Sequence, residues 1–256
     1  MLDGSSERQA RLEERFQRDG FVHIESFLSP QEVDEVEVHL KDYIELIVPT
    51  LAKSEAIYED YDNPTTLKQL FYMHLRDSFF SQLLDNPRIV GLAAALLKDK
   101  VISKNVNFLN KPAGSGKPTP PHQDGFYYSL IPNEALTIWI ALDDVDYDNG
   151  ALHYVKGSHK RGLLSHSASN VLGFSQRLVG ENTTEIGEEV TCQAKRGDCL
   201  IHHSLTIHSA DGNRSQRTRR AVALVYYAER AKVDEGAQQR YLESVTAQQK
   251  EQRILS

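Results

Sequence analysis

Hydrophobic residues in the N-terminal third of the chain recur at helical spacing. After Pro30, apolar side chains follow at steps of three and four, at Val33, Val36, Leu40, Ile44 and Ile47. This spacing predicts one amphipathic helix that runs to about Val48. The start of the helix is marked by Ser29, which can cap the first turn, by Pro30 at the first helical position, and by Glu32, which can close a capping box.

Three more helices and one short strand are expected in the same third. Residues 7–19 carry Leu12 and Phe16 at helical spacing, and two further apolar helical series lie on either side of Pro87. The members of these two series are Phe79, Phe80, Leu83 and Leu84, then Ile89, Val90, Ala93, Leu96 and Leu97. Residues 21–24 alternate in the manner of a strand.

From about residue 101 the pattern changes to short β-rich runs separated by Gly, Asn, Asp and Pro. The runs are VISKNVNFLN, ALTIWIALDDV, ALHYV, EVTCQA, CLIHHSLTIH and RRAVALVYYA. Such runs are typical of an all-β sandwich or barrel. Helical patterns between them are missing, which argues against a parallel α/β sheet. Residues 160–190 predict a long loop over one mouth of the barrel, and the segment after Glu235 predicts a surface helix.

Composition narrows the class of partner. Of the 256 residues, 40% are hydrophobic and 25% charged, and the net charge of −7 provides no general basic surface for nucleic acid. No apolar run is long enough to span a bilayer, and the N-terminal segment has no apolar signal core. Cys192 and Cys199 are too few for a disulfide framework or a metal cluster of their own. We therefore expect a cytoplasmic protein that binds neither nucleic acid nor membrane; the oligomeric state is left open.

The β-rich part contains the run Pro121-His122-Gln123-Asp124. On a strand, His122 and Asp124 would point to the same face. An imidazole beside a carboxylate makes two-thirds of a 2-His-1-carboxylate triad, which fills one face of an Fe(II) octahedron and leaves three positions open. Alone, the H-x-D pattern arises often by chance.

A third ligand has three candidates in the run from Gly197 to His208. His208 closes a strand beside the turn at 209–213, where a reachable site would lie. His202 and His203 are better interpreted as hydrogen-bonded core residues.

Four arginines follow His208, and most such clusters are solvated surface. They are Arg214, Arg217, Arg219 and Arg220. Arg219, however, begins an apolar strand on which it shares a face with Ala221 and Ala223. These small residues leave room beside the guanidinium, which could bind a carboxylate through two parallel hydrogen bonds.

The order of these features resembles the phytanoyl-CoA dioxygenase-like family of Fe(II)/2-oxoglutarate-dependent oxygenases. The resemblance covers nearly the whole chain, in the segments DGFVHIESFLSPQEV, NKPAGSGKPTPPHQD, LTIWIALDDVDYDNGALHYVKGSHKRGLL and KRGDCLIHHSLTIHSADGNRSQRTRRA. It implies a mainly β fold with flanking helices in one domain. A double-stranded β-helix (jelly-roll) core at about 101–230 is buttressed by N-terminal helices at about 1–100 and followed by a helix at about 235–250.

The resemblance also implies roles for single residues. His122, Asp124 and His208 match the iron ligands, and Arg219 matches the residue that holds the distal carboxylate of 2-oxoglutarate.

Three further residues are implied in the cosubstrate pocket. Trp139 matches a tryptophan that lines it, and Asn107 matches a position on the strand beside it. Family members often place a Ser where this chain has Ala210, and we expect Ser209 to be the residue that could replace its hydrogen bond.

The implied reaction consumes O2 and decarboxylates 2-oxoglutarate to succinate while a C–H bond of the substrate is hydroxylated. Related halogenases have Gly or Ala where this chain has Asp124, so hydroxylation is favoured over halogenation. Three alternatives stay open: the same cofactors used for desaturation, ring formation or epimerisation; a jelly-roll binding protein; and a cupin-type enzyme with another metal.

The substrate is the least defined part. Candidate lining residues are Phe126, Tyr127, Tyr128 and His74, although most aromatics in such regions belong to the core. A small metabolite is favoured over an acyl-CoA, whose phosphates would need a basic rim. Lys156, Lys160 and Arg161 could offer such a rim, but the net charge gives it no general support.

Overall fold

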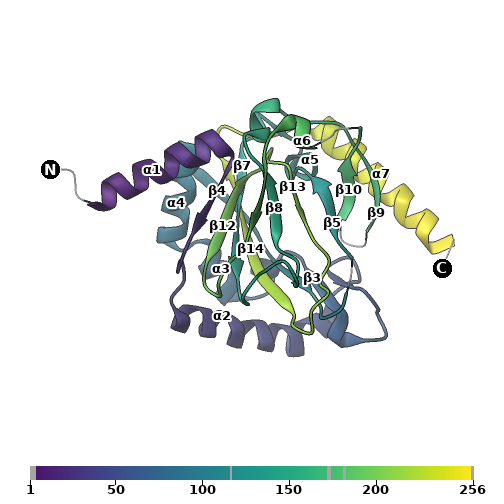
Figure 1. The fold of residues 1–256 in the computed structure, drawn as a ribbon. Coiled ribbons are helices and arrows are strands. Elements are labelled where there is room, and N and C mark those ends of the chain that lie inside the picture. Colours follow the sequence, from purple (N-terminus) through teal and green to yellow (C-terminus); the bar gives the residue numbers. More distant parts are fainter. Residues whose placement is uncertain (1–3, 116, 172–173, 181–182, 255–256) are drawn as a thin grey trace.

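Two antiparallel sheets face one another at the centre of the computed structural model, which describes residues 4–115, 117–171, 174–180 and 183–254 (Figure 1). The larger sheet has, in spatial order, β1 (Phe21–Ile24), β12 (Cys199–His203), β7 (Ala135–Ala141), β14 (Arg219–Ala228), β4 (Val101–Lys111), β3 (Leu67–Leu70) and β2 (Ala56–Tyr58). The smaller has β11 (Glu189–Cys192), β8 (Leu152–Val155), β13 (His208–Ala210) and β5 (Thr119–His122). The strands expected beyond residue 101 are confirmed.

Four helices belong to the N-terminal part, as predicted: α1 (Gly4–Asp19), α2 (Pro30–Asp42), α3 (Ser78–Leu84) and α4 (Pro87–Leu97). The capping box at the start of α2 is present, because Ser29 Oγ accepts from the Glu32 amide and the Glu32 carboxylate accepts from the Ser29 amide. Past Asp42 the chain continues through a π-helical turn, η1 (Tyr43–Ile47), and a 3-10 turn, η2 (Val48–Thr50). The helical region therefore extends as far as expected, but its last two turns are not α-helical.

A large apolar core joins these helices to the outer face of the larger sheet. Helix residues such as Val36, Phe80 and Leu96 pack with strand residues such as Phe108 and Leu224, and all five are at most 2% exposed. A second, smaller core fills the space between the sheets. It includes Phe21, Trp139, Tyr154, Leu200, Ala221 and Ala223. The inner core is the layer in which the candidate site lies.

Two expectations about the secondary structure were incomplete. The strand expected at residues 21–24 is β1, which pairs with β12, but the N-terminal part also contributes β2 and β3 to the larger sheet, and these two strands were not expected. Residues 160–190 are not a plain loop: they contain an antiparallel hairpin, β9 (His166–Val171) and β10 (Phe174–Leu178), and a short helix, α6 (Thr183–Ile186). This hairpin forms a sheet of its own, so its strands lack the apolar pattern of the two main sheets.

The other elements are short connections and the C-terminal helix. They are η3 (Pro64–Thr66), η4 (Met73–Leu75), α5 (Gly125–Tyr128), β6 (Leu130–Ile131), η5 (Ser158–Arg161), β15 (Lys232–Val233) and α7 (Glu235–Ile254). The surface helix expected after Glu235 is α7, which lies beyond the β9–β10 hairpin in Figure 1. None of the described helices is long and apolar enough to cross a membrane. Cys192 and Cys199 are both buried and unbridged.

Candidate metal centre

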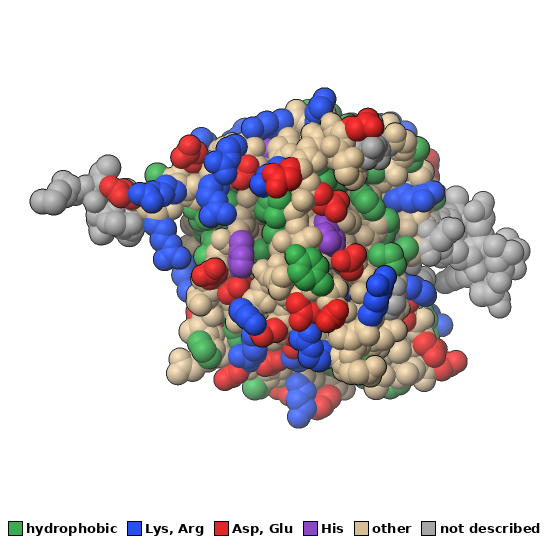
Figure 2. Space-filling model, in the orientation of Figure 1, with side chains coloured by type: hydrophobic (Ala, Val, Ile, Leu, Met, Phe, Trp, Pro, Cys, Tyr) green, Lys and Arg blue, Asp and Glu red, His purple; other side chains and the backbone are tan. Residues whose placement is uncertain are grey.

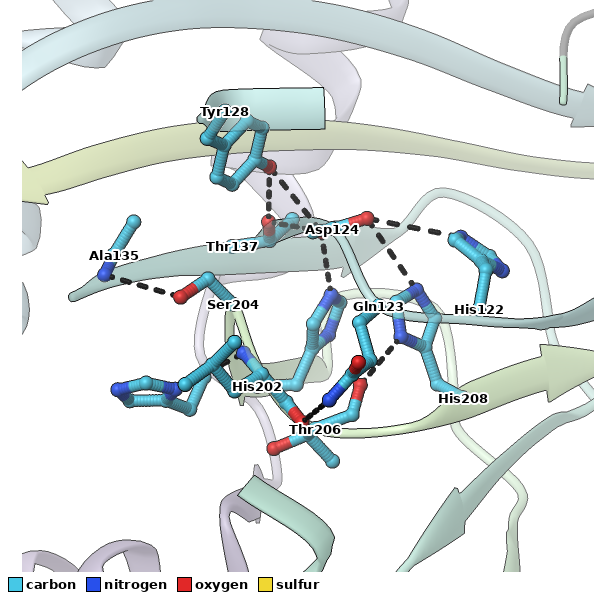
Figure 3. Close-up of polar contacts among 12 residues, drawn as sticks. His122, Gln123, Asp124, Tyr128, Ala135, Thr137, His202, Ser204, Thr206 and His208 are labelled. Carbon is cyan, nitrogen blue, oxygen red and sulfur yellow. Dashed lines mark hydrogen bonds and ion pairs between the residues drawn. The ribbon is translucent and has the colours of Figure 1, made fainter. Parts of the chain in front are cut away.

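Three side chains meet between the sheets. His122 ends β5 and His208 begins β13, and the two residues oppose one another in the strand register. With Asp124 they place one ligand atom each within 4.8 Å of one another. Asp124 Oδ1 lies 3.7 Å from His122 Nε2 and 3.6 Å from His208 Nε2 (Figure 3). The structure thus brings together the three residues that the sequence singled out.

Both imidazoles are oriented by backbone carbonyls. His122 Nδ1 lies 2.9 Å from the Pro120 carbonyl oxygen, and His208 Nδ1 lies 3.0 Å from that of Thr206. Because a carbonyl only accepts, each Nδ1 carries the proton and each Nε2 keeps its lone pair for a metal. Burial lowers the pKa of both histidines, which favours the neutral, ligating form.

Asp124 does not lie on a strand, contrary to the same-face argument. Strand β5 ends at His122, and Asp124 has helical backbone angles at the start of α5. The carboxylate is positioned by side chains: Oδ2 lies 2.8 Å from Thr137 Oγ1, 3.1 Å from His202 Nε2 and 3.2 Å from the Tyr128 hydroxyl. Burial alone would raise the pKa of Asp124, but His208, His202 and His122 outweigh it and hold the pKa well below its usual range. Asp124 is therefore an ionised carboxylate.

A buried cationic side chain, Arg219, is linked to the metal centre along β7. Thr137 touches Asp124, and Trp139, two residues further along β7, has the Arg219 guanidinium 5.3 Å above its ring. Arg219 is 5% exposed, and its Nε has no hydrogen-bond partner in the described part of the chain. Burial lowers its pKa to about 10, so it remains a cation at neutral pH.

Lys111 is a second buried basic residue beside Arg219. The two residues are partners in the β4–β14 register, and Lys111 is 4% exposed. Burial and the charge of Arg219 lower the pKa of Lys111 to about 6. A buried guanidinium with an unpartnered N–H, beside an amine that can take up a proton, is suited to binding an anion.

The other arginines of the cluster lie at the surface. Arg220 forms ion pairs with Asp143 and Glu37, and Arg217 with Asp146. Arg214 is exposed. Only Arg219 among the four is buried with the small residues of β14.

The two remaining cosubstrate candidates lie differently with respect to the site. Asn107 of β4 pairs with Ala223, which in turn pairs with Trp139, so it lies two strands from the tryptophan; its Oδ1 accepts from the Tyr72 amide. Ser209 follows His208 on β13 and pairs with His153. Strand alternation turns it to the face opposite His208. Both roles stay predictions.

The four candidate substrate residues divide into two groups. Tyr127 has its ring edge toward His122, with 6.0 Å between centroids, and Tyr128 donates to Asp124 or Thr137, so both border the metal centre. Phe126 instead packs on His166, at the start of the β9–β10 hairpin. His74, on η4, accepts from the Val106 amide.

Sequence reasoning missed three contributors to this site. Lys111 and Thr137 carried no motif signal. His202 is a buried hydrogen-bonded residue, as expected, but its partner is the candidate ligand Asp124. β12 is buried on both faces, so its pattern did not indicate which histidine points between the sheets.

The fold and the site together define a jelly-roll protein with a facial-triad metal centre. The family model described as phytanoyl-CoA dioxygenase (PhyH) matches residues 16–221, and the chain belongs to this family. A probable alpha-ketoglutarate-dependent hypophosphite dioxygenase of Stutzerimonas stutzeri is 30% identical over 218 residues, which cover 82% of this chain and 75% of that protein. Peroxisomal phytanoyl-CoA dioxygenase of Rattus norvegicus is 27% identical over 146 residues, 55% of this chain and 43% of that protein.

Solved structures agree with this assignment. The epimerase SnoN in complex with Fe3+, alpha ketoglutarate and nogalamycin RO is 25% identical, with a TM-score of 0.71 and coverage of 89% of this chain and 86% of that one. The carbocyclase SnoK, from nogalamycin biosynthesis, shares the fold at 24% identity, with a TM-score of 0.67 and coverage of 87% and 85%. The protein is a 2-oxoglutarate-dependent non-haem iron dioxygenase with a jelly-roll core, rather than a cupin-type enzyme or a binding protein.

Proposed function

We propose that this dioxygenase hydroxylates an unactivated C–H bond of a small metabolite, with His122, Asp124 and His208 as the iron ligands. The observation that carries the proposal is the meeting of Asp124 Oδ1 and two histidine Nε2 atoms in a buried site. Two neutral imidazoles and one carboxylate are the donor set that suits non-haem Fe(II).

The cationic pocket fits the distal carboxylate of 2-oxoglutarate. Arg219 offers a buried guanidinium with an unpartnered Nε, and Trp139 holds the guanidinium plane from one side. Lys111 adds a second positive charge when protonated. We assign the distal carboxylate to Arg219, with Trp139 as a wall of the pocket and Asn107 on the adjoining strand.

When bound, iron with 2-oxoglutarate and O2 supplies the oxidant, and 2-oxoglutarate leaves as succinate and CO2. The protein's own residues orient the metal ligands and enclose the site. The Nδ1 hydrogen bonds of His122 and His208 fix the ligand faces, and Tyr127 covers the ring edge of His122. The carboxylate of Asp124 occupies a position that a halide would otherwise take, which favours hydroxylation.

A small substrate is favoured over an acyl-CoA. Lys156, one of the three residues considered for a basic rim, is paired with Glu188. On the face shown in Figure 2, Lys and Arg side chains are mixed with Asp and Glu. Hypophosphite, named for the S. stutzeri relative, has P–H bonds and no C–H bond, so succinate release with it would indicate P–H oxidation instead of C–H hydroxylation.

Anaerobic titration of the apoprotein with Fe(II) and 2-oxoglutarate tests the ligand set without knowledge of the substrate. We expect a weak visible charge-transfer band that is lost in His208→Ala. Persistence of the band in that variant would remove His208 from the ligand set. Succinate release on addition of candidate substrates, followed by mass analysis of products, then separates hydroxylation from desaturation or epimerisation, the activity named for SnoN.

A further inference from the structure

The carboxylate of Asp124 is held in one orientation by groups outside the ligand triad. Oδ1 faces His122 and His208, whereas Oδ2 is surrounded by Thr137, His202 and Tyr128 (Figure 3). Asp124 itself lies beyond the end of β5, so no strand ladder fixes its backbone. The orientation of this carboxylate must come from its side-chain partners.

His202 is the partner with a chain of support behind it. Its Nε2 lies 3.1 Å from Asp124 Oδ2, and its Nδ1 lies 3.1 Å from the hydroxyl of Tyr154. His202 and Tyr154 are 2% and 0% exposed. The ring of Tyr154 stacks on Phe21, with centroids 4.6 Å apart. Both hydrogen bonds in this arrangement are direct contacts between protein groups, so no bridging water is required.

The positions of the protons determine the direction of donation along this series of hydrogen bonds. An ionised carboxylate only accepts, so Nε2 of His202 must carry the proton that it donates to Oδ2. In a neutral imidazole Nδ1 is then an acceptor, and the hydroxyl of Tyr154 donates to it. Tyr154 thereby selects the tautomer of His202 that can hold Asp124.

This series of hydrogen bonds also joins the two sheets. His202 is on β12 and pairs with Thr137 of β7, so both donors to Oδ2 lie side by side in the larger sheet. Tyr154 is on β8 of the smaller sheet and pairs with His208. The residue that sets the tautomer of His202 is thus the strand neighbour of a candidate metal ligand.

We propose that His202, with its tautomer set by Tyr154, is a positioning residue that commits Asp124 Oδ2 to the protein and so presents Oδ1 as a single ligand atom. This inference rests on the ligand set proposed above. Outer-shell partners of this kind typically change metal affinity 10- to 100-fold when removed. His202 touches neither cosubstrate nor substrate in this role.

The test is anaerobic Fe(II) titration of the whole protein at saturating 2-oxoglutarate, with the dissociation constant and the position of the charge-transfer band as readouts. We expect His202→Leu to weaken Fe(II) binding about 10- to 100-fold and to shift the band. His202→Gln, which keeps an N–H donor, should recover part of the affinity. Tyr154→Phe should weaken binding about three- to tenfold, the effect of one neutral hydrogen bond.

The matched control is the adjacent histidine. His203 Nδ1 accepts from the Leu205 amide, and its ring packs near Phe16 and His159, away from Asp124. His203→Leu removes a mostly buried imidazole one residue away, and we expect its Fe(II) affinity to stay within about twofold of the wild type. A fall in His203→Leu equal to that in His202→Leu would mean that general loss of packing, not the contact to Asp124, is responsible, and would overturn the proposal.

The remaining outcomes separate the two proposals. If the wild-type protein forms no charge-transfer band, the ligand set itself fails. If the wild type binds Fe(II) and His202→Leu binds it equally well with the same band, only the positioning role fails. Should His202→Leu not fold, Tyr154→Phe decides, because it retains the stacked ring and removes one hydroxyl; unchanged Fe(II) affinity in it overturns the proposal.

Discussion

Replacement of Arg219 by leucine tests the cosubstrate pocket most directly. Arg219 is 5% exposed, and its Nε has no hydrogen-bond partner among the residues that the structure describes. A carboxylate bound there would form a buried charged pair, and removal of one member of such a pair costs about 2–5 kcal/mol. Because Lys111 remains beside the site, we expect the lower part of this range, about 2–3 kcal/mol, or about 30- to 150-fold weaker binding of 2-oxoglutarate.

The apoprotein should respond in the opposite sense. Without an anion, Arg219 is a buried cation beside a lysine whose amine is mostly neutral at pH 7.5, and a buried charge that lacks a partner opposes folding. We therefore expect the Arg219→Leu apoprotein to be at least as stable to urea as the wild type. An arginine with a purely structural role would show the reverse, a loss of stability with no change in cosubstrate affinity.

Equilibrium titration of the Fe(II)-loaded protein with 2-oxoglutarate measures the effect, and Arg220→Leu is the matched control. Arg220 adjoins Arg219 in the chain but pairs with Asp143 and Glu37 at the surface. Its removal should leave the 2-oxoglutarate dissociation constant within about twofold. The reasoning is refuted if Arg219→Leu binds 2-oxoglutarate like the wild type, or if Arg220→Leu loses as much affinity.

Three further outcomes are expected. Asp124→Ala should abolish both the charge-transfer band and turnover; full activity in this variant would exclude Asp124 as a ligand. Because the pKa of Lys111 is lowered to about 6, its amine is mostly neutral at pH 7.5, and binding of the 2-oxoglutarate anion should take up close to one proton, measured by calorimetry in two buffers and absent in Lys111→Met. Burial lowers the pKa of His203 to about 3, below its unfolded value, so the apoprotein loses stability as pH falls below 6.5, by about 1.5 kcal/mol at pH 5 from this residue. Urea unfolding of the wild type and of His203→Leu at pH 6.5 and at pH 5 should show this difference. An identical pH dependence of the two proteins would contradict it.

The sequence predicted that the three triad residues lie close together, but it predicted the backbone geometry at Asp124 less well. His122 and Asp124 stay within reach of a common metal in almost any backbone conformation, because only one residue separates them. The strand that was assumed for both ends at His122, and Asp124 starts a helical turn. The side chains of Thr137 and His202, which are 13 and 78 residues away in the sequence, orient its carboxylate. A linear pattern does not contain such contacts.

Hydrophobic periodicity was informative for elements with one solvent-exposed and one buried face, and it failed for the other elements. The start of α2 was predicted to the residue because Ser29, Pro30 and Glu32 act locally. On β12, both faces are buried, so alternation did not distinguish His202 from its neighbours. The β9–β10 hairpin pairs only with itself, and its polar composition indicated a loop.

The elements that border the metal centre explain why the class of enzyme is easier to predict than its substrate. Helix α5 begins at Gly125, directly after Asp124, so Phe126 and Tyr127 lie in the turn that follows the ligand. Besides the contact of Tyr127 with His122, their contacts lie outside the two facing sheets: the hydroxyl of Tyr127 donates to the Gln176 carbonyl on β10, and both rings meet Tyr241 of α7 edge-on. His122, His208 and Arg219 are placed by strand register and Asp124 by its side-chain partners, whereas Phe126 and Tyr127 also contact a separate hairpin and a C-terminal helix. Substitutions in those two elements can therefore change which substrate is admitted while the ligand geometry between the sheets is preserved.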